Sequence, residues 1–165
     1  MSVITREITL SDVNSHYFAL LCQLSGTPDQ QDRPHPETTM GWLRYAENND
    51  HVIFVCEDEE YAGPLCPKII GTASVLIEHK FLHHGSRVGH IEDVVVSSEF
   101  RGMGIGGELI QACVALCESR DCYKVILDCS KENVPFYEVC GFGDAGHCMR
   151  TVSYTHLTLP TILRV

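Results

Sequence analysis

The sequence predicts an α/β (α+β) fold, in which helices flank a mixed central sheet. The first observation is the order of elements: strands with two early helices, then strand, helix, strand, helix, strand. The second is a run of three valines, Val94–Val96, that leads into a glycine-rich turn and a helical pattern. We expect one domain over 1–153. Residues 154–165 follow no period and resemble a translated cloning remnant, so we expect a tail outside the fold.

The first half of the chain predicts two helices among strands. The expected elements are a strand over 4–10, a helix over 11–24, a loop over 25–36, a helix over 36–47, and strands over 51–57 and 68–79. Ser11 is a favourable N-cap for the first helix. Gly71 interrupts the last of these strands and favours a β-bulge there.

The second half predicts a βαβ unit. The expected elements are a strand over 89–96, a helix ending near 120, strands over 123–129 and 147–152, and a short helix over 134–140. The strands before and after the long helix should be parallel neighbours joined by a right-handed crossover. Asn133 is suited to cap the short helix, and Gly141 to end it.

Charge and length exclude some partners. The formal net charge is -10, which argues against nucleic acid or an anionic membrane surface, since both require a basic face. No apolar run approaches the length of a membrane span. An anionic ligand would have to be held by backbone N–H groups and a few placed cations.

The chain has nine cysteines, an odd number, with no CxxC spacing. Cys113, Cys117, Cys129 and Cys140 lie in apolar patterns, so we expect reduced, buried thiols in an intracellular, cytoplasmic protein. We expect no metal site from the cysteines or from the histidines His79, His83 and His84.

Residues 101–106, Arg-Gly-Met-Gly-Ile-Gly, fit the pattern Arg/Gln-x-x-Gly-x-Gly/Ala between a strand and a helix. Glycines let a ligand approach the backbone closely, and the N–H groups of a helix N-terminus attract anions such as phosphate. No Gly-Lys-Ser/Thr follows, and several strands precede the turn, so neither a P-loop nor a dinucleotide-binding turn fits. A purely structural turn is the alternative.

In this context the motif resembles the pyrophosphate loop of the GNAT N-acetyltransferases, which bind acetyl-CoA. The segments 78–83, 89–96, 122–129 and 133–142 resemble the glucosamine-6-phosphate N-acetyltransferase branch of that superfamily. The resemblance covers residues 69–142 and implies a GNAT fold. In this fold the mixed central sheet is mostly antiparallel, and acetyl-CoA lies in a cleft between splayed central strands. It also implies direct acetyl transfer to the 2-amine of D-glucosamine 6-phosphate, a step in UDP-N-acetylglucosamine biosynthesis.

The reaction requires a neutral amine, donors for the tetrahedral oxyanion and a proton for the leaving thiolate. Glu92, Asp93 and Asp128 lie near the ends of two adjacent expected strands, where carboxylates can hold an aminosugar and take its proton. They could instead be ordinary surface acids, although burial of two acids inside an apolar strand would be costly. The resemblance makes Tyr137 the acid for the thiolate; the alternative is a core aromatic beside Phe136.

Further roles come from the resemblance alone. It assigns acetyl-CoA binding to Val94, Val95, Val96, Arg101, Gly102, Met103, Gly104, Ile105, Gly106, Gly107, Asn133 and Tyr137. It assigns the aminosugar phosphate to Ser25, Lys80, His83, Glu92, Asp93 and Asp128, with Glu92, Asp128 and Tyr137 catalytic. A solvated surface residue is the alternative for Lys80.

The resemblance also implies a homodimer with sites near the interface, and a basic residue near the C-terminus that completes the phosphate site. This chain departs from that pattern, because Arg150 is followed by Thr-Val-Ser. Two other functions remain open: a GNAT acetyltransferase acting on a polyamine or protein amine, and a non-catalytic acyl-CoA-binding module.

Overall fold

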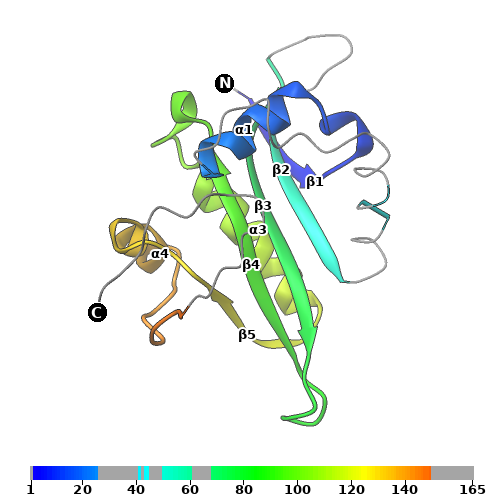
Figure 1. Ribbon diagram of the computed structural model, residues 1–165, viewed down its shortest axis with the longest axis vertical. Coiled ribbons are helices and arrows are strands. Elements are labelled where there is room, and N and C mark those ends of the chain that lie inside the picture. Colours follow the sequence, from blue (N-terminus) through cyan, green and yellow to red (C-terminus); the bar gives the residue numbers. More distant parts are fainter. Residues whose placement is uncertain (1, 26–40, 42, 45–49, 61–67, 150–165) are drawn as a thin grey trace, which may run out of the picture.

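The computed structural model describes residues 2–25, 41, 43, 44, 50–60 and 68–149. One five-stranded sheet runs through the molecule in the order β1-β2-β3-β4-β5 (Figure 1). Its strands are β1 (Val3–Glu7), β2 (His51–Asp58), β3 (Ile69–His79), β4 (Arg87–Val96) and β5 (Cys122–Leu127). The first four are antiparallel neighbours, whereas β4 and β5 are parallel. The predicted mixed, mostly antiparallel sheet is therefore confirmed.

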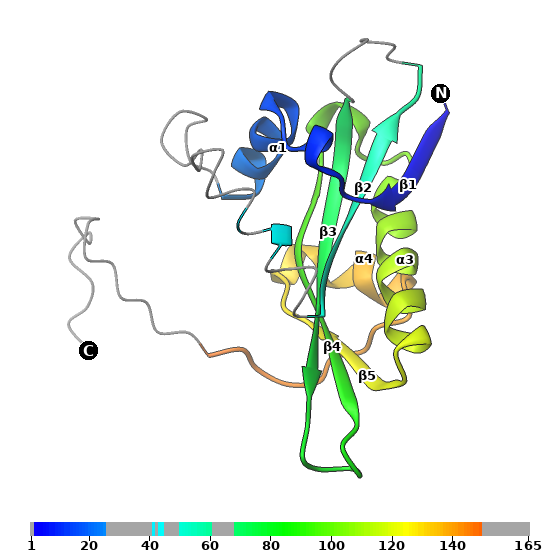
Figure 2. The same ribbon diagram turned by 90° about the vertical axis from the view of Figure 1, so that its right-hand side faces the viewer.

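Two helices cover opposite faces of the sheet, as Figure 2 shows with α1 on one side and α3 on the other. Helix α3 (Ile105–Ser119) makes the crossover from β4 to β5, and its buried residues Leu109, Ile110 and Cys113 pack in the larger core cluster. Helix α1 (Ser15–Ser25) places Tyr17 and Leu20 in a smaller cluster on the other face. The predicted parallel βαβ unit is confirmed.

The α1 face is covered only in part. Val55, Ile69 and Val95 lie in the α1 cluster, but Leu76, farther along the sheet, is 42% exposed. The same face continues through Glu78, which is only half-buried. Within the described residues, the part of this face around Leu76 and Glu78, near the β3–β4 connection, is thus open.

Strand β4 carries a bulge at its centre. Thr72 pairs with Val95 and Ser74 with Glu92, so β4 has one residue more than β3 in this interval. Asp93 lies there with φ of 53°. A second register shift lies between β2 and β3, where Cys56 pairs with Gly71 and Glu57 with Ile69, beside the glycine that predicted a bulge.

The first helix begins later than predicted. Ser11 lies in a short 3-10 turn, Leu10–Asp12, and the N-cap is Asn14, whose Oδ1 accepts the N–H of His16 at 2.9 Å. Asp12 bonds the Arg6 guanidinium at 2.6 and 2.8 Å, which forms the turn before the helix starts.

The short helix α4 (Val134–Val139) follows a 3-10 turn, Lys131–Asn133. Asn133 occupies the N-cap position of this helix, as predicted, but its side chain makes no capping hydrogen bond because its own backbone is already helical. Gly141 ends the helix with φ of 91°, as predicted.

Three other expectations have mixed outcomes. Residues 41, 43 and 44 of the second predicted helix are helical, while the rest of it, the loop after residue 25 and the tail over 154–165 lie outside the described residues. Residues 147–149 lie in no strand, because the chain there runs irregularly past the end of β5. Cys113 and Cys117 are buried and Cys140 is half-buried, but Cys129 is exposed since it follows the end of β5.

Candidate functional site

The glycine turn joins β4 to α3 and is open to solvent. Gly102 (φ 79°) and Gly104 (φ 87°) adopt left-handed conformations that disfavour other residues. A Cβ added at Gly102, Gly104 or Gly107 would meet no heavy atom within 4 Å. The first N–H groups of α3 have no intrahelical acceptor, as at any helix N-terminus. The turn therefore presents bare backbone donors at an uncrowded surface, which suits an anion.

Neighbouring residues support this turn. Gly106 packs against the Phe136 ring of α4, where an added Cβ would lie 3.1 Å from Cζ. The Arg101 side chain donates from Nε to the Val96 carbonyl oxygen at 3.1 Å and so links the turn to the end of β4. Ile105 is buried in the α3 core cluster, whereas Met103 is 58% exposed.

Strands β4 and β5 separate at Ile91, several residues before β4 ends and leads into this turn. The pairing of β4 with β5 runs from Arg87–Cys122 to Ile91–Leu127, and β4 then continues to Val96 without β5 beside it (Figure 1). On its other side β4 keeps β3, with Val95 opposite Thr72 and Val96 opposite Gly71. Among the described strands, the edge of β4 over Val94–Val96 that faces β5 is thus unpaired.

The acids Glu92, Asp93 and Asp128 lie where the two strands part. All three are exposed, because the bulge and the end of β5 leave them in solvent. The cost of burying acids in an apolar strand is therefore no argument for their role. Partial burial raises the pKa of the Glu92 carboxyl, and the charges of Asp93 and Asp128 raise it further. Asp128 accepts a hydrogen bond from the Cys148 thiol at 3.0 Å.

Tyr137 lies on α4 and is 9% exposed. Its ring contacts Phe136 and Phe142, with centroids 4.9 and 6.2 Å away. Burial raises the pKa of its phenol, and the nearby thiols of Cys129, Cys140 and Cys113 act in the same direction. The phenol is therefore protonated at neutral pH and can donate a proton. Asn133, one turn earlier, is exposed.

The predicted phosphate residues are not all brought together. Lys80 follows β3, and its Nζ donates to Glu78 Oε1 at 2.5 Å. His83 lies in the β3–β4 connection with its ring 4.8 Å from that of Tyr123, and no contact in the described residues links it to the three acids. Ser25 is the last residue of α1, and its side chain lies outside the described residues.

Sequence reasoning missed two polar residues on the open face. Glu78 Oε2 lies 2.8 Å from His90 Nε2, so one carboxylate joins His90 to Lys80. Glu78 lies two residues after Leu76 on β3, and His90 lies opposite Leu76 on β4, so both share its face of the sheet. The signal available in the sequence was the presence of polar residues at these alternate strand positions.

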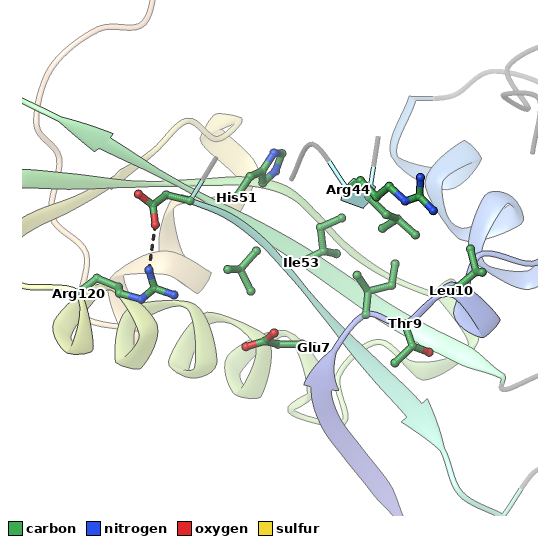
Figure 3. A pocket seen from close by; sticks show the side chains of 11 residues that line it. Glu7, Thr9, Leu10, Arg44, His51, Ile53 and Arg120 are labelled. Carbon is green, nitrogen blue, oxygen red and sulfur yellow. Dashed lines mark hydrogen bonds and ion pairs between the residues drawn. The ribbon is translucent and has the colours of Figure 1, made fainter. Parts of the chain in front are cut away.

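A separate pocket of about 420 Å³ lies at the other edge of the sheet (Figure 3). Glu7 and Thr9 line it from the end of β1, His51 and Ile53 from β2, and Arg120 from the end of α3. Arg120 Nη1 donates to Asp50 Oδ1 at 2.9 Å. None of its lining residues is among those that the sequence predicts for the site.

Within the described residues, no group of three or more His, Cys, Asp or Glu side chains is arranged to hold a metal ion. The same part of the chain contains no helix long and apolar enough to cross a membrane.

Comparison with known proteins gives consistent matches. A profile described as "Acetyltransferase (GNAT) family" matches residues 18–142. The chain is 43% identical over 139 residues to a glucosamine 6-phosphate N-acetyltransferase of Arabidopsis thaliana, covering 84% of this chain and 89% of the relative.

Solved structures agree. A crystal structure of the Arabidopsis thaliana glucosamine-6-phosphate N-acetyltransferase has a TM-score of 0.78 and 38% identity, covering 92% of this chain and 99% of the other. An acetyltransferase of Trypanosoma brucei has a TM-score of 0.80 and 33% identity, with 92% and 100% coverage.

Proposed function

Because this chain belongs to the acetyltransferase (GNAT) family, we propose that it transfers an acetyl group from acetyl-CoA to the 2-amine of D-glucosamine 6-phosphate. The similarity to relatives named glucosamine 6-phosphate N-acetyltransferase supports glucosamine 6-phosphate as the acceptor. The observation that supports the site is the position of Glu92, Asp93 and Asp128 where β4 and β5 part, on the strand that leads into the glycine turn and at the end of its neighbour. The product would be N-acetylglucosamine 6-phosphate, a precursor of UDP-N-acetylglucosamine.

The described residues fit acetyl-CoA. The open backbone of 101–107 would hold its pyrophosphate, because the turn offers N–H donors and no Cβ at its left-handed positions. The unpaired edge of Val94–Val96 would bind the pantetheine arm and give the thioester carbonyl its N–H donors. Asn133, exposed just before α4, completes this set of coenzyme contacts.

The proton steps would then divide between two groups. The acids Glu92, Asp93 and Asp128 would hold the ammonium of the aminosugar, and Glu92 or Asp128 would take its proton, directly or through water. The neutral amine attacks the thioester carbon, so that a C–N bond forms and the C–S bond breaks. Tyr137 would protonate the departing sulfur. Lys80, with His83 and Ser25 as further contacts, would bind the sugar phosphate.

The proposal includes a homodimer. Phe81 and Leu82 at the tip of the β3–β4 connection are 106% and 73% exposed, and Leu76 on the open sheet face is 42% exposed. Large apolar side chains exposed near one another are common at association surfaces of soluble proteins, and these three lie within seven residues of the chain. A second copy on this face would lie beside Lys80 and could supply the basic residue for the phosphate.

A thiol-release assay with different acceptors tests the function. The full chain with acetyl-CoA should release CoA fastest with glucosamine 6-phosphate, more slowly with glucosamine, and at background rate with spermidine or a lysine peptide. Preference for spermidine would favour the polyamine acetyltransferase, and acetyl-CoA binding without thiol release would favour a binding module. Repeating the assay on residues 1–153 tests our expectation that the tail is dispensable.

Tyr137→Phe should lower kcat about 10- to 100-fold and change KM for the sugar phosphate much less. The ring packing on Phe136 and Phe142 is kept, while the acidic proton is lost. The effect is modest for an acid, because a thiolate leaves partly unprotonated. Steady-state kinetics check this, with Tyr123→Phe, which removes an exposed hydroxyl from β5, as control. An unchanged kcat would remove Tyr137 from the acid role.

A further inference from the structure

His90 and Glu78 have no role in the site described above, yet their side chains are in direct polar contact on the open face of the sheet. His90 Nε2 is 2.8 Å from Glu78 Oε2, and Glu78 Oε1 accepts from Lys80 Nζ. His90 is half-buried, with 27% of its side chain exposed. The His90 ring is therefore held by the Glu78 carboxylate, whose other oxygen binds the Lys80 ammonium.

The sheet register places His90 beside Glu92. Leu76 pairs with His90 and Ser74 with Glu92, so the two β4 residues are alternate positions on one face. The Ser74 hydroxyl donates to the Glu92 carbonyl oxygen at 3.2 Å and holds the strand just before the bulge. Two residues along a strand correspond to about 6.6 Å, within range of a charge interaction.

The charges around Glu92 act in two directions. Partial burial, Asp93 and Asp128 all raise the pKa of the Glu92 carboxyl, whereas the charge of His90 lowers it. Other titratable and charged groups face this pair from the neighbouring elements. Strand β3 ends with Glu78 and Lys80, β4 carries Asp93, and β2 begins with His51. Lys124 lies on β5, Asp128 directly follows β5, and Tyr17 lies on α1.

We propose that His90, held by Glu78, is a positioning residue for Glu92, and that its positive charge keeps the Glu92 carboxylate ionised and able to accept a proton. Because Lys80 already neutralises Glu78, a protonated His90 leaves a net positive charge beside the three acids. The positive charge of an imidazolium stabilises a nearby carboxylate, and so opposes the partial burial and the charges of Asp93 and Asp128, which favour the protonated form of Glu92. The catalytic consequence rests on the proposed function.

Substituting His90 in the full chain tests the proposal without substrate. His90→Gln keeps a donor for Glu78 but has no charge, whereas His90→Lys keeps a charge. The titration midpoint of the Glu92 carboxyl, followed by carbon-13 NMR, should rise by about half a pH unit in His90→Gln and return toward the wild-type value in His90→Lys. His79→Gln, which removes a second carboxylate-bonded histidine one residue after Glu78, is the control and should leave the midpoint unchanged.

The same variants are then assayed for acetyl transfer. The acid limb of kcat/KM against pH should move upward by about half a pH unit in His90→Gln and not in His90→Lys or His79→Gln. A purely structural role would lower activity in both His90 variants without moving the limb.

Equal Glu92 midpoints in wild-type and His90→Gln protein, or a midpoint in His90→Lys as high as in His90→Gln, would overturn the proposal. A shifted midpoint in a protein that fails to acetylate glucosamine 6-phosphate would leave the His90 inference standing and remove the proposed acceptor.

Discussion

Asp128→Asn is expected to lower kcat/KM for glucosamine 6-phosphate by roughly 10²- to 10⁴-fold while acetyl-CoA binding stays within about twofold. The asparagine has nearly the same shape and can still accept a hydrogen bond from Cys148, whose thiol lies 3.0 Å from Asp128 Oδ2. It cannot carry the negative charge that holds an ammonium, nor can it take a proton. The change therefore isolates charge and basicity from packing.

The position of Asp128 explains the size of this effect. It follows the last residue of β5, on the side where β4 has already separated, and its charge acts on Glu92. Removing the Asp128 charge should bring the pKa of Glu92 back toward the ordinary value, so Glu92 becomes a weaker base. The ammonium of the aminosugar also loses one of its carboxylate contacts. Both changes slow transfer of the amine proton.

Steady-state kinetics and calorimetric titration of acetyl-CoA measure the two quantities. Asp121→Asn is the matched control, because Asp121 is an exposed acid at the opposite end of β5 with φ of 56°, which asparagine tolerates. A rate within threefold of wild type would exclude Asp128 as a proton acceptor. Loss of both activity and acetyl-CoA binding would indicate misfolding.

The fold was predictable where the pattern was long and local. The α3 helix and its flanking strands follow from the three valines, the glycine turn and an apolar stripe that includes Leu109 and Cys113. The bulge at Asp93 was not predictable, because it depends on the pairing of β4 with β3. The start of α1 was missed because Asp12 bonds Arg6, which comes from the preceding strand.

The site was predictable as a set of residue types and less so as a geometry. The sequence identified Glu92 and Asp128 as paired acids, but their exposure depends on where β4 and β5 part. Glu78 and His90 are twelve residues apart, and only the hairpin register brings them together. Contacts between residues distant in sequence were therefore what the residue pattern could not provide.

Asp12→Asn is expected to lower the free energy of unfolding by about 3 kcal/mol at pH 7. The Asp12 side chain is fully buried, at 0% exposure, and its carboxylate accepts two bonds from Arg6 at 2.6 and 2.8 Å. It also accepts from the backbone N–H and the hydroxyl of Thr9, at 2.6 and 2.9 Å. The asparagine would leave one donor in this cluster unmatched and Arg6 with Glu57 as its remaining carboxylate.

The pH dependence has a defined sign. Burial would raise the pKa of Asp12, but the hydrogen bonds from Arg6 and Thr9 outweigh it and hold the pKa below the ordinary 3.8. A carboxyl with a lowered folded-state pKa stabilises fully above its unfolded value and loses that contribution as the pH falls through the folded value. The stability difference between wild type and Asp12→Asn should therefore be constant from about pH 7 to 5 and shrink below about pH 4.

Urea unfolding at pH 7, 5 and 3.5 measures this difference, and Asp144→Asn, at an exposed acid, should match wild type throughout. A constant difference down to pH 3.5 would mean that packing around Asp12, and not its charge, stabilises the turn between β1 and α1.

The turn at Asp12 joins β1 to α1, and α1 supplies Tyr17 and Leu20 to the core cluster that contains Val95. Loss of the Arg6–Asp12 contact should therefore also loosen β4 next to the acids. Asp12→Asn should thus raise KM for the sugar phosphate at temperatures below unfolding, although Asp12 contacts none of the site residues.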